Sequence, residues 1–313
     1  LPAPYGSLID RDKPLQFQFE GEPLSGYSGD TIASALLADR RWLLSRSFKY
    51  HRPRGVLTMA GQDANTMVQL PSDPNALADR ELIKEGMKVT GQNYSGSLEK
   101  DRGALLGLFS RFLPVGFYYK AFFKPRGMWE KWAPLIRKKA GLGVIDQQLK
   151  PDYYDKQYKF YDVVVVGGGP AGMQAAIDAG IGNCEVLLVD ENPILGGSLN
   201  YARLDTKGVL SQQIREEMVT RIQANSNITV MTNAVCNGWF ADNWLPVISG
   251  NRLYKIRASQ TILCTGALEQ PALFHNNDLP GIVMSSAAQR MIHLYGIKPG
   301  TEAVILTGNN DGY

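Results

Sequence analysis

The chain has 313 residues, of which 44% are hydrophobic and 20% are charged, and its formal net charge is +3 at pH 7. These values are typical of a globular protein of about two domains and exclude a disordered chain. So small a net charge gives no sign of a nucleic-acid partner. The longest apolar stretch, residues 105–119, is interrupted by Arg111 and Pro114 and is shorter than the roughly 20 residues of a membrane span, so no membrane partner is predicted.

The three cysteines, Cys184, Cys236 and Cys264, lie far apart in the sequence. No pair has the spacing of metal ligands, so the sequence predicts neither a metal site nor a disulfide framework. Free thiols fit a reducing compartment, and no secretory signal is visible at the start, so we expect a cytoplasmic protein. Cys264 ends an apolar run at residues 261–264, and we interpret it as a small core residue of a strand.

Residues 1–95 are predicted to form a small β-grasp or ferredoxin-like α+β domain. Residues 15–19 alternate apolar and polar side chains, as in a half-buried strand, and Gly21 and Glu22 follow as a turn. Asp30 is a suitable N-cap for a short helix over residues 31–38. Strand, turn, strand and helix is the order in which such a domain begins.

Residues 96–158 are interpreted as an aromatic-rich linker with helical pieces at 105–112 and 129–140. Aromatic residues are dense between positions 109 and 132. That density favours docking against another domain or subunit, or packing onto the chain's own second domain, and the sequence leaves both open.

Residues 159–313 are predicted to form a Rossmann-like, doubly wound α/β domain, incomplete at its C-terminus. Strands and helices alternate along it, with strands expected at residues 162–166, 186–190, 228–231 and 261–264 and helices at 171–179 and 209–224. A last apolar run, residues 303–307, leads as a strand into Gly308, the start of a second βα unit. Because the chain stops at Tyr313 before any helix, we expect a fragment of a longer polypeptide.

The motif that carries chemistry follows the strand at 162–166 and matches G-x-G-x-x-G: Gly167, Gly168, Gly169, Pro170, Ala171 and Gly172. The first glycine of this pattern permits a tight turn, the second lets a pyrophosphate approach the backbone, and the third allows close helix–strand packing. The helix that follows presents unpaired N–H groups to the phosphates. Asp190 ends the next strand, where a carboxylate accepts hydrogen bonds from a ribose and disfavours NADP. The sequence therefore predicts a binding site for NAD or FAD.

Other positions after predicted strands are expected to approach the same cofactor. Asp190 is followed by Glu191 and Asn192, and then by a glycine turn at Gly196, Gly197 and Ser198. Thr265 and Gly266 follow the strand at 261–264, where an α/β sheet closes over its ligand. Together with the glycine motif, these features favour the two-dinucleotide flavoprotein type of domain over the single-domain dehydrogenase type.

No catalytic residue is predicted. The three histidines, His51, His275 and His293, are in no metal-ligand or nucleophile–base pattern, and we interpret them as structural. Redox chemistry would belong to the cofactor. Lys49, His51, Arg52 and Arg54 form a basic cluster that either contacts acidic partner groups or a phosphate, or is paired within the chain, and we favour the second interpretation.

Several short sequence segments resemble the alpha subunit of heterotetrameric sarcosine oxidase, and they occur in the same order along essentially the whole chain. They lie at residues 19–21, 26–38, 47–55, 116–120, 136–143 and 265–271. The resemblance implies a hetero-oligomeric flavoprotein oxidase that demethylates sarcosine to glycine with hydrogen peroxide and formaldehyde or methylene-tetrahydrofolate. It also implies NAD in this domain, held by residues 167–172 with Asp190 and Glu191, and with Val235 at the adenine.

In that family FMN and a second flavin, FAD, lie in the wider complex, which includes smaller subunits as well as the beta subunit. The fragment alone is therefore expected to be inactive. Related oxidase subunits carry a [2Fe–2S] cluster in the N-terminal domain, which needs four thiolates. Residues 56–61, after Gly55, contain no cysteine, so we expect no cluster here. Two alternatives are a non-catalytic assembly module and an FAD-dependent amine or opine dehydrogenase subunit.

Overall fold

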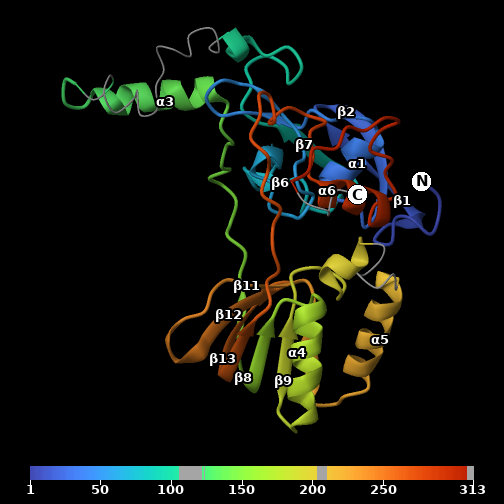
Figure 1. Cartoon of the computed structure of the whole chain (residues 1–313). Helices are drawn as coiled ribbons and strands as arrows, with labels where there is room; N and C mark the ends of the chain where they lie inside the picture. The colour runs from blue at the N-terminus through green and yellow to red at the C-terminus, as the bar shows by residue number, and fades with distance from the viewer. Residues whose placement is uncertain (106–121, 123, 203–209, 309–313) are drawn as a thin grey trace. The chain divides into compact units, whose positions relative to one another are not determined.

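The computed structural model describes residues 1–105, 122, 124–202 and 210–308. It divides into two compact units, drawn in Figure 1. We call Leu1–Leu149 with Glu269–Tyr313 the first unit, and Lys150–Leu268 the second unit. The segment after Glu269, which the sequence analysis assigned to the dinucleotide domain, thus groups with the N-terminal residues.

The first unit contains a five-stranded mixed sheet in the order β2-β1-β7-β5-β6. β1 is antiparallel to β2 and parallel to β7. Phe17 and Phe19, on alternate positions of β1, are almost fully buried, which confirms the strand predicted at residues 15–19. The strands are β1 (Asp10–Phe19), β2 (Glu22–Ser28), β5 (Met67–Gln69), β6 (Ala76–Leu77) and β7 (Met87–Gly91).

Helix α1 (Ile32–Ala38) is present as predicted, but its N-cap is Thr31 rather than Asp30. The Thr31 hydroxyl accepts from the Ser34 backbone N–H, and the Ser34 hydroxyl accepts from the Thr31 N–H, which is a complete capping box. The Asp30 carboxylate instead accepts from the Tyr27 N–H and the Ser34 hydroxyl. It stabilises the turn before the helix rather than the helix end itself.

Among its described residues, the first unit also contains helices α3 (Met128–Ala140) and α6 (Ser285–His293), a short hairpin of β3 (Ser45–Arg46) and β4 (Pro53–Arg54), and the 3-10 turn η1 (Ala64–Thr66). α3 confirms the helix predicted at 129–140. The helix predicted at 105–112 lies outside the described residues after Leu105, as do most of the linker aromatics and the sequence segment at 116–120. α6 was not predicted; Ala287 and Met291 on it are fully buried.

The strand predicted at residues 303–307 is wrong. In the described chain these residues join no sheet, and their apolar side chains at 304–306 are exposed. An apolar run becomes a strand only when a neighbouring strand accepts its hydrogen bonds. No described strand pairs with these residues.

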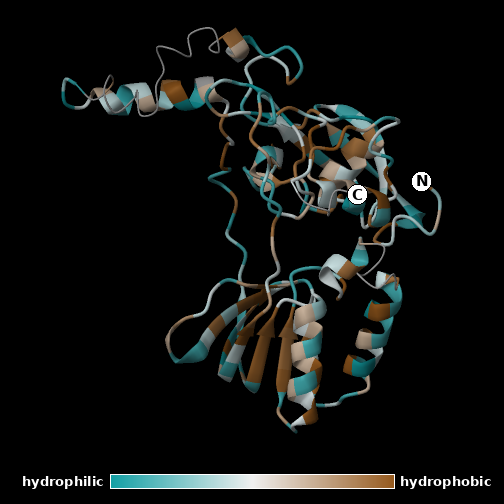
Figure 2. Cartoon of the chain, viewed as in Figure 1, coloured by the Kyte–Doolittle hydropathy of each residue, from teal (hydrophilic) through white to brown (hydrophobic). Residues whose placement is uncertain are grey.

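The second unit is built on a six-stranded sheet in the order β10-β9-β8-β13-β12-β11. The first four strands are parallel, and β13, β12 and β11 form an antiparallel meander. Figure 2 shows the apolar character of β8 and β9. The strands are β8 (Asp155–Val166), β9 (Val186–Val189), β10 (Ile228–Met231), β11 (Ala234–Cys236), β12 (Trp244–Ser249) and β13 (Arg252–Leu263).

All four strands predicted in this region are present, and β8 and β13 are longer than predicted. β11 and β12 were missed. Cys264 lies one residue beyond β13 and is only partly buried, although it packs against the core as expected. The helices predicted at 171–179 and 209–224 are α4 (Pro170–Ile181) and α5 (Ser211–Gln223).

Both faces of the central strands are covered. Alternate residues of β8 and β9 pack with Met173 and Ile177 of α4 and Ile222 of α5. The intervening residues, such as Val164 and Leu187, pack with meander residues. Strands buried on both faces need the continuous apolar run found at residues 163–166. Each fully buried side chain of this kind contributes about 1.5–3 kcal/mol.

Short 3-10 turns complete the unit at η3 (Gly197–Asn200) and η4 (Ala241–Asn243). Among the helices that the structure describes, none combines the length and the apolar character that crossing a membrane requires.

Candidate functional site

The glycine motif forms the turn between β8 and α4 in the second unit. Gly167 has a φ of +106°, and a Cβ there would lie 2.2 Å from the carbonyl oxygen of Cys264. Its N–H donates to the Val189 carbonyl at 2.8 Å, which ties the turn to the end of β9. Only glycine fits this position, so the first glycine of the motif is required by the protein's own backbone.

Gly172 is required for packing. A Cβ on it would lie 1.8 Å from the Gly167 carbonyl oxygen, because the first turn of α4 presses against the loop. This close approach is the role expected of the third glycine.

Gly169 is different. Its φ of −73° and ψ of −177° suit any residue, and a Cβ there would approach nothing nearer than the Gly197 Cα at 3.9 Å. It is the N-cap of α4, and no side chain caps the helix. Neither strain nor packing therefore explains a glycine here, whereas a Cβ would fill the space before the free N–H groups of α4. That space, at the positive end of a helix, is suited to a phosphate.

Asp190 follows β9 and reaches the same loop. Its Oδ2 accepts from the Gly168 N–H at 2.5 Å, and its Oδ1 accepts from the backbone and side-chain N–H groups of Asn192 at 2.7 and 2.9 Å. The side chain is 7% exposed. From sequence, this carboxylate is expected to contact a ribose. In the structure it also organises the glycine turn, which no sequence signal indicated.

The second glycine turn also meets the first. The Gly196 N–H donates to the Gly168 carbonyl at 2.8 Å. A Cβ on Gly197 would lie 2.8 Å from the Gly169 Cα. Leu195 and Arg215, neither singled out from sequence, lie against Gly168 and Gly196 respectively. Both are ordinary helix or loop residues in the sequence pattern, so only the fold reveals them.

The remaining predicted residues lie around this centre. Thr265 lies beside Gly167, since a Cβ on that glycine would be 3.2 Å from the Thr265 nitrogen. Val235 lies on β11, whose first residue, Ala234, donates to the Asp190 carbonyl at 3.0 Å. The others are more peripheral. Pro170 and Ala171 begin α4, the side chains of Glu191 and Ser198 are exposed, and a Cβ on Gly266 would meet no atom within 4 Å. The structure thus brings together the carboxyl ends of β8, β9 and β13, where an α/β sheet binds ligands.

Neither a metal centre nor a catalytic constellation accompanies this loop cluster. Within the described ranges, no three His, Cys, Asp or Glu side chains could together hold a metal ion. Burial raises the pKa of the Cys236 thiol, which favours its neutral form.

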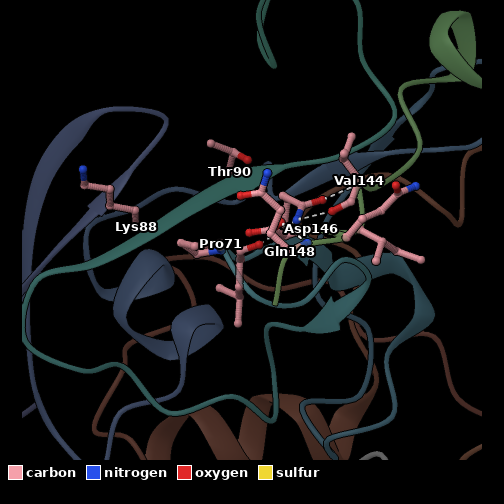
Figure 3. Close-up of a pocket in the computed structure, with 10 residues that line it drawn as sticks. Pro71, Lys88, Thr90, Val144, Asp146 and Gln148 are labelled. Atoms are coloured by element: carbon pink, nitrogen blue, oxygen red, sulfur yellow. Dashed lines mark hydrogen bonds between the residues drawn. The ribbon is translucent and has the colours of Figure 1, made fainter. Parts of the chain in front are cut away.

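The first unit has a separate pocket of about 630 Å³, shown in Figure 3. Gln69 lines this pocket, and its side chain donates to the Val144 carbonyl and accepts from the Val144 N–H. The ten lining residues, at positions 69–71, 88, 90 and 144–148, include one carboxylate and no histidine or cysteine. They offer no nucleophile–base pair, and none of the predicted site residues is among them.

The basic cluster is paired within the first unit, as favoured from sequence. Arg52 makes a bidentate pair with Asp278, with both N···O distances at 2.8 Å, and Arg54 pairs with the same carboxylate at 2.6 Å. His51 is buried, and its Nδ1 lies 2.6 Å from the Asp101 carboxylate. Lys49 lies over the Tyr50 ring.

Comparison with known proteins agrees with this division. Residues 162–266 match a family described as FAD dependent oxidoreductase. The alpha subunit of sarcosine oxidase from Rhizobium meliloti (strain 1021) is 39% identical over 332 residues, covering 99% of this chain and 33% of that relative. The chain is a relative of sarcosine oxidase alpha subunits. It spans about a third of the length of the curated relatives it matches.

Two further similarities have narrower meaning. An opine oxidase subunit from Agrobacterium tumefaciens (strain Ach5) is 27% identical over 161 residues, covering 47% of this chain and 32% of that relative. Among solved structures, L-proline dehydrogenase from P. horikoshii aligns over 96% of this chain and 50% of that protein, with a TM-score of 0.66 and 24% identity. This similarity establishes the fold alone: a Rossmann-like fold preceded by a small N-terminal domain.

Residues 12–94 match a family described as 2Fe-2S iron-sulfur cluster binding domain. Such a cluster needs four thiolates or, in Rieske centres, two histidines in place of two of them. The matched span contains one histidine, the buried His51, and no cysteine. Its residues therefore do not fit the group for which the family is named.

Proposed function

We propose that this chain is the dinucleotide-binding portion of the alpha subunit of a multi-subunit sarcosine oxidase. The observation that carries the proposal is Gly169, a glycine that the protein's own backbone does not require and that opens the N-terminus of α4 to a phosphate. The relatedness to sarcosine oxidase alpha subunits over 99% of the chain supports the identity of the enzyme. Because the chain spans only about a third of the length of these relatives, oxidative demethylation of sarcosine would be an activity of the whole assembly.

We propose NAD as the nucleotide, with FAD as the alternative in the same site. The N–H groups at the start of α4 would bind the pyrophosphate, and Asp190 would hold the turn and accept from the adenosine ribose. The backbone near Val235 would meet the adenine, and residues 196–198 with Glu191, Thr265 and Gly266 would border the ligand. A bound nicotinamide or flavin supplies hydride transfer, which none of this chain's side chains provides.

The partners we propose are smaller subunits together with the beta subunit, in the cytoplasm, with FMN and a further FAD in the wider complex. We propose a β-grasp fold for residues 1–95, because a mixed sheet with β1 parallel to β7 and one helix suits it. We also propose that this domain holds no iron–sulfur cluster, since it has no cysteine.

The test is to purify the wild-type chain and a Gly169→Val variant, denature both, and identify the released nucleotide by chromatography and absorbance. The wild type should release NAD without visible colour. Gly169→Val should release none, while its thermal unfolding in the nucleotide-free state should shift little. Gly182→Ala is the matched control: this glycine caps the other end of α4 at a φ of −78°, and a Cβ there meets nothing nearer than 3.5 Å.

Unchanged nucleotide content in Gly169→Val, or equal loss in Gly182→Ala, would overturn the assignment of the loop. A yellow protein that releases FAD would favour the second candidate, an FAD-dependent amine or opine dehydrogenase subunit. The match to the FAD-dependent family and the similarity to the opine oxidase relative support this candidate. A wild type that neither retains nor binds added nucleotide would favour an assembly module.

A further inference from the structure

A loop in the first unit turns seven consecutive backbone N–H groups inward. The N–H groups of residues 57, 58 and 59 donate to the Asp63 carboxylate at 2.8–3.1 Å. That of residue 60 donates to the Thr58 hydroxyl at 3.2 Å. Those of residues 61, 62 and 63 donate to Oδ2 of Asp79 at 2.7, 3.1 and 3.3 Å. Successive N–H groups that converge in this way form a concavity for negative charge.

Two buried carboxylates fill this concavity. Asp63 is 4% exposed and Asp79 is 3% exposed. Two hydroxyl groups complete the network: Thr58 donates to Asp63, and the buried Thr66 contacts both Oδ1 of Asp79 and the Asp63 carbonyl oxygen at 3.1 and 2.8 Å. Buried carboxylates are stable only when they are hydrogen-bonded as fully as these are.

The spacing of these four residues is that of a metal cluster. Four residues separate Thr58 from Asp63, two residues separate Asp63 from Thr66, and Asp79 comes later in the chain. Plant-type [2Fe–2S] sites use C-x₄-C-x₂-C with a more distant fourth cysteine. All four positions lie inside residues 12–94, the span that matches the iron–sulfur family. The four side chains also converge in space, as cluster ligands must.

We propose that Thr58, Asp63, Thr66 and Asp79 stand at the four ligand positions of a lost [2Fe–2S] site, and that their hydrogen-bond network holds the loop in place of the cluster. Cluster sulfurs accept N–H hydrogen bonds from the surrounding loop. The carboxylate oxygens of Asp63 and Asp79 accept from the same kind of inward N–H groups. These oxygens replace the cluster sulfurs as hydrogen-bond acceptors, but a carboxylate cannot be reduced as a cluster can. The network therefore stabilises the loop, and the domain does not transfer electrons. This goes beyond the proposed function, which says only that this domain holds no cluster.

The positional part is tested by restoring the ligands. A variant with Thr58→Cys, Asp63→Cys, Thr66→Cys and Asp79→Cys is incubated with iron and sulfide without oxygen. It should gain the visible absorbance of a [2Fe–2S] cluster and, on reduction, its electron paramagnetic resonance signal. The matched control shifts the first three cysteines by one residue, as Leu57→Cys, Gln62→Cys and Asn65→Cys with Asp79→Cys, and should bind no stoichiometric cluster. The wild type should bind none.

A folded in-register variant without a cluster, or equal loading of the shifted control or the wild type, would overturn the proposal. Because four substitutions at buried positions can prevent folding, amide hydrogen exchange on single variants provides a second, independent test of the proposal. Asp63→Ala should speed exchange at residues 57–59 first, and Asp79→Ala at residues 61–63 first, each by more than tenfold. Exchange that is unchanged in both groups of amides, or that rises equally in both whichever carboxylate is removed, would show that the two carboxylates do not hold the loop in this way.

Discussion

The backbone N–H of Gly168 donates to the Asp190 carboxylate at 2.5 Å, so the acidic residue after β9 is joined to the glycine turn after β8. The shape of the glycine turn therefore depends on a residue that follows Gly168 by 22 positions.

Asp190→Ala should both loosen the turn and weaken nucleotide retention. It removes acceptors from Gly168 and Asn192 and leaves the buried Gly168 N–H without a partner, which costs about 1–3 kcal/mol. Chemical denaturation measures the loss in free energy of unfolding, and nucleotide release measures the binding. Asp178→Ala, which removes an exposed carboxylate of α4, is the control and should change neither by more than about 0.5 kcal/mol. An Asp190→Ala protein as stable as the wild type would contradict this account of the turn.

Gly172→Ala and Gly169→Ala should separate folding from binding. The first places a Cβ 1.8 Å from the Gly167 carbonyl, so the second unit should lose about 3 kcal/mol or more, at or above the upper end of overpacking effects. The second meets ordinary contacts only and should leave the nucleotide-free stability within about 0.5 kcal/mol of wild type while reducing nucleotide content. Thermal unfolding and released nucleotide are measured on both. Equal destabilisation by the two changes would mean that Gly169 is also a structural glycine.

Asp79→Asn should change the pH dependence of stability in the first unit. Burial, and then the nearby Asp63 carboxylate, raise the pKa of Asp79 above its ordinary value of 3.8. The folded state therefore binds this proton more tightly than the unfolded chain. Its contribution to stability is full below pH 3.8 and is lost as pH rises through the raised pKa.

The asparagine cannot ionise, so the stability of Asp79→Asn relative to wild type should rise between about pH 4 and 7, by about 1.4 kcal/mol for each unit of pKa elevation. Denaturation curves across this range measure the difference. The exposed Asp12→Asn serves as the control and should run parallel to wild type. If the difference in free energy of unfolding between Asp79→Asn and wild type stays constant or falls as pH rises, burial does not raise the pKa of Asp79 as described.

Asp278→Asn should remove a contribution that disappears in acid. The Arg52 guanidinium, and after it Arg54, hold the pKa of the Asp278 carboxyl well below its ordinary range. A depressed pKa stabilises the fold above pH 3.8, and the stabilisation is lost as pH falls below that value towards the folded pKa.

The group is partly exposed, so the expected loss for Asp278→Asn near neutral pH is only about 1 kcal/mol and should shrink in high salt. The loss should vanish at the acid end of a pH series. Asp10→Asn breaks a more exposed pair with Lys13 and should therefore destabilise the fold less than Asp278→Asn does. A larger effect for Asp10 than for Asp278 would argue against the bidentate pair as a stabilising contact.

Local signals predicted most of the dinucleotide unit. The run at residues 163–166, the glycine turn and the strand ending at Asp190 each carry their pattern within a few residues, and they formed as expected. The loop–carboxylate bond between Gly168 and Asp190 could not be predicted, because it depends on two strands lying side by side. β11 and β12 were missed for a related reason: they are short or contain Pro246, and they are strands only because β13 provides a partner.

The opposite error occurred at residues 303–307, where a strong apolar run has no described partner strand. The N-cap at Thr31 was missed because the acidic residue before it is an equally good candidate by type. Only the geometry, with Asp30 turned towards Tyr27 and Ser34, separates them. Sequence thus predicted elements whose patterns are local, and failed where pairing between distant segments decides.

The grouping of Glu269–Tyr313 with Leu1–Leu149 has a consequence for biosynthesis. Every strand of the described six-stranded sheet is encoded within residues 150–268, whereas α6 with its buried Met291 and the carboxylate that pairs with Arg52 are encoded only after that segment. Synthesis on the ribosome therefore supplies all the described strands of the second unit's sheet before it supplies these parts of the first unit. The first unit is begun earlier, but it receives its buried C-terminal helix and this ion pair last.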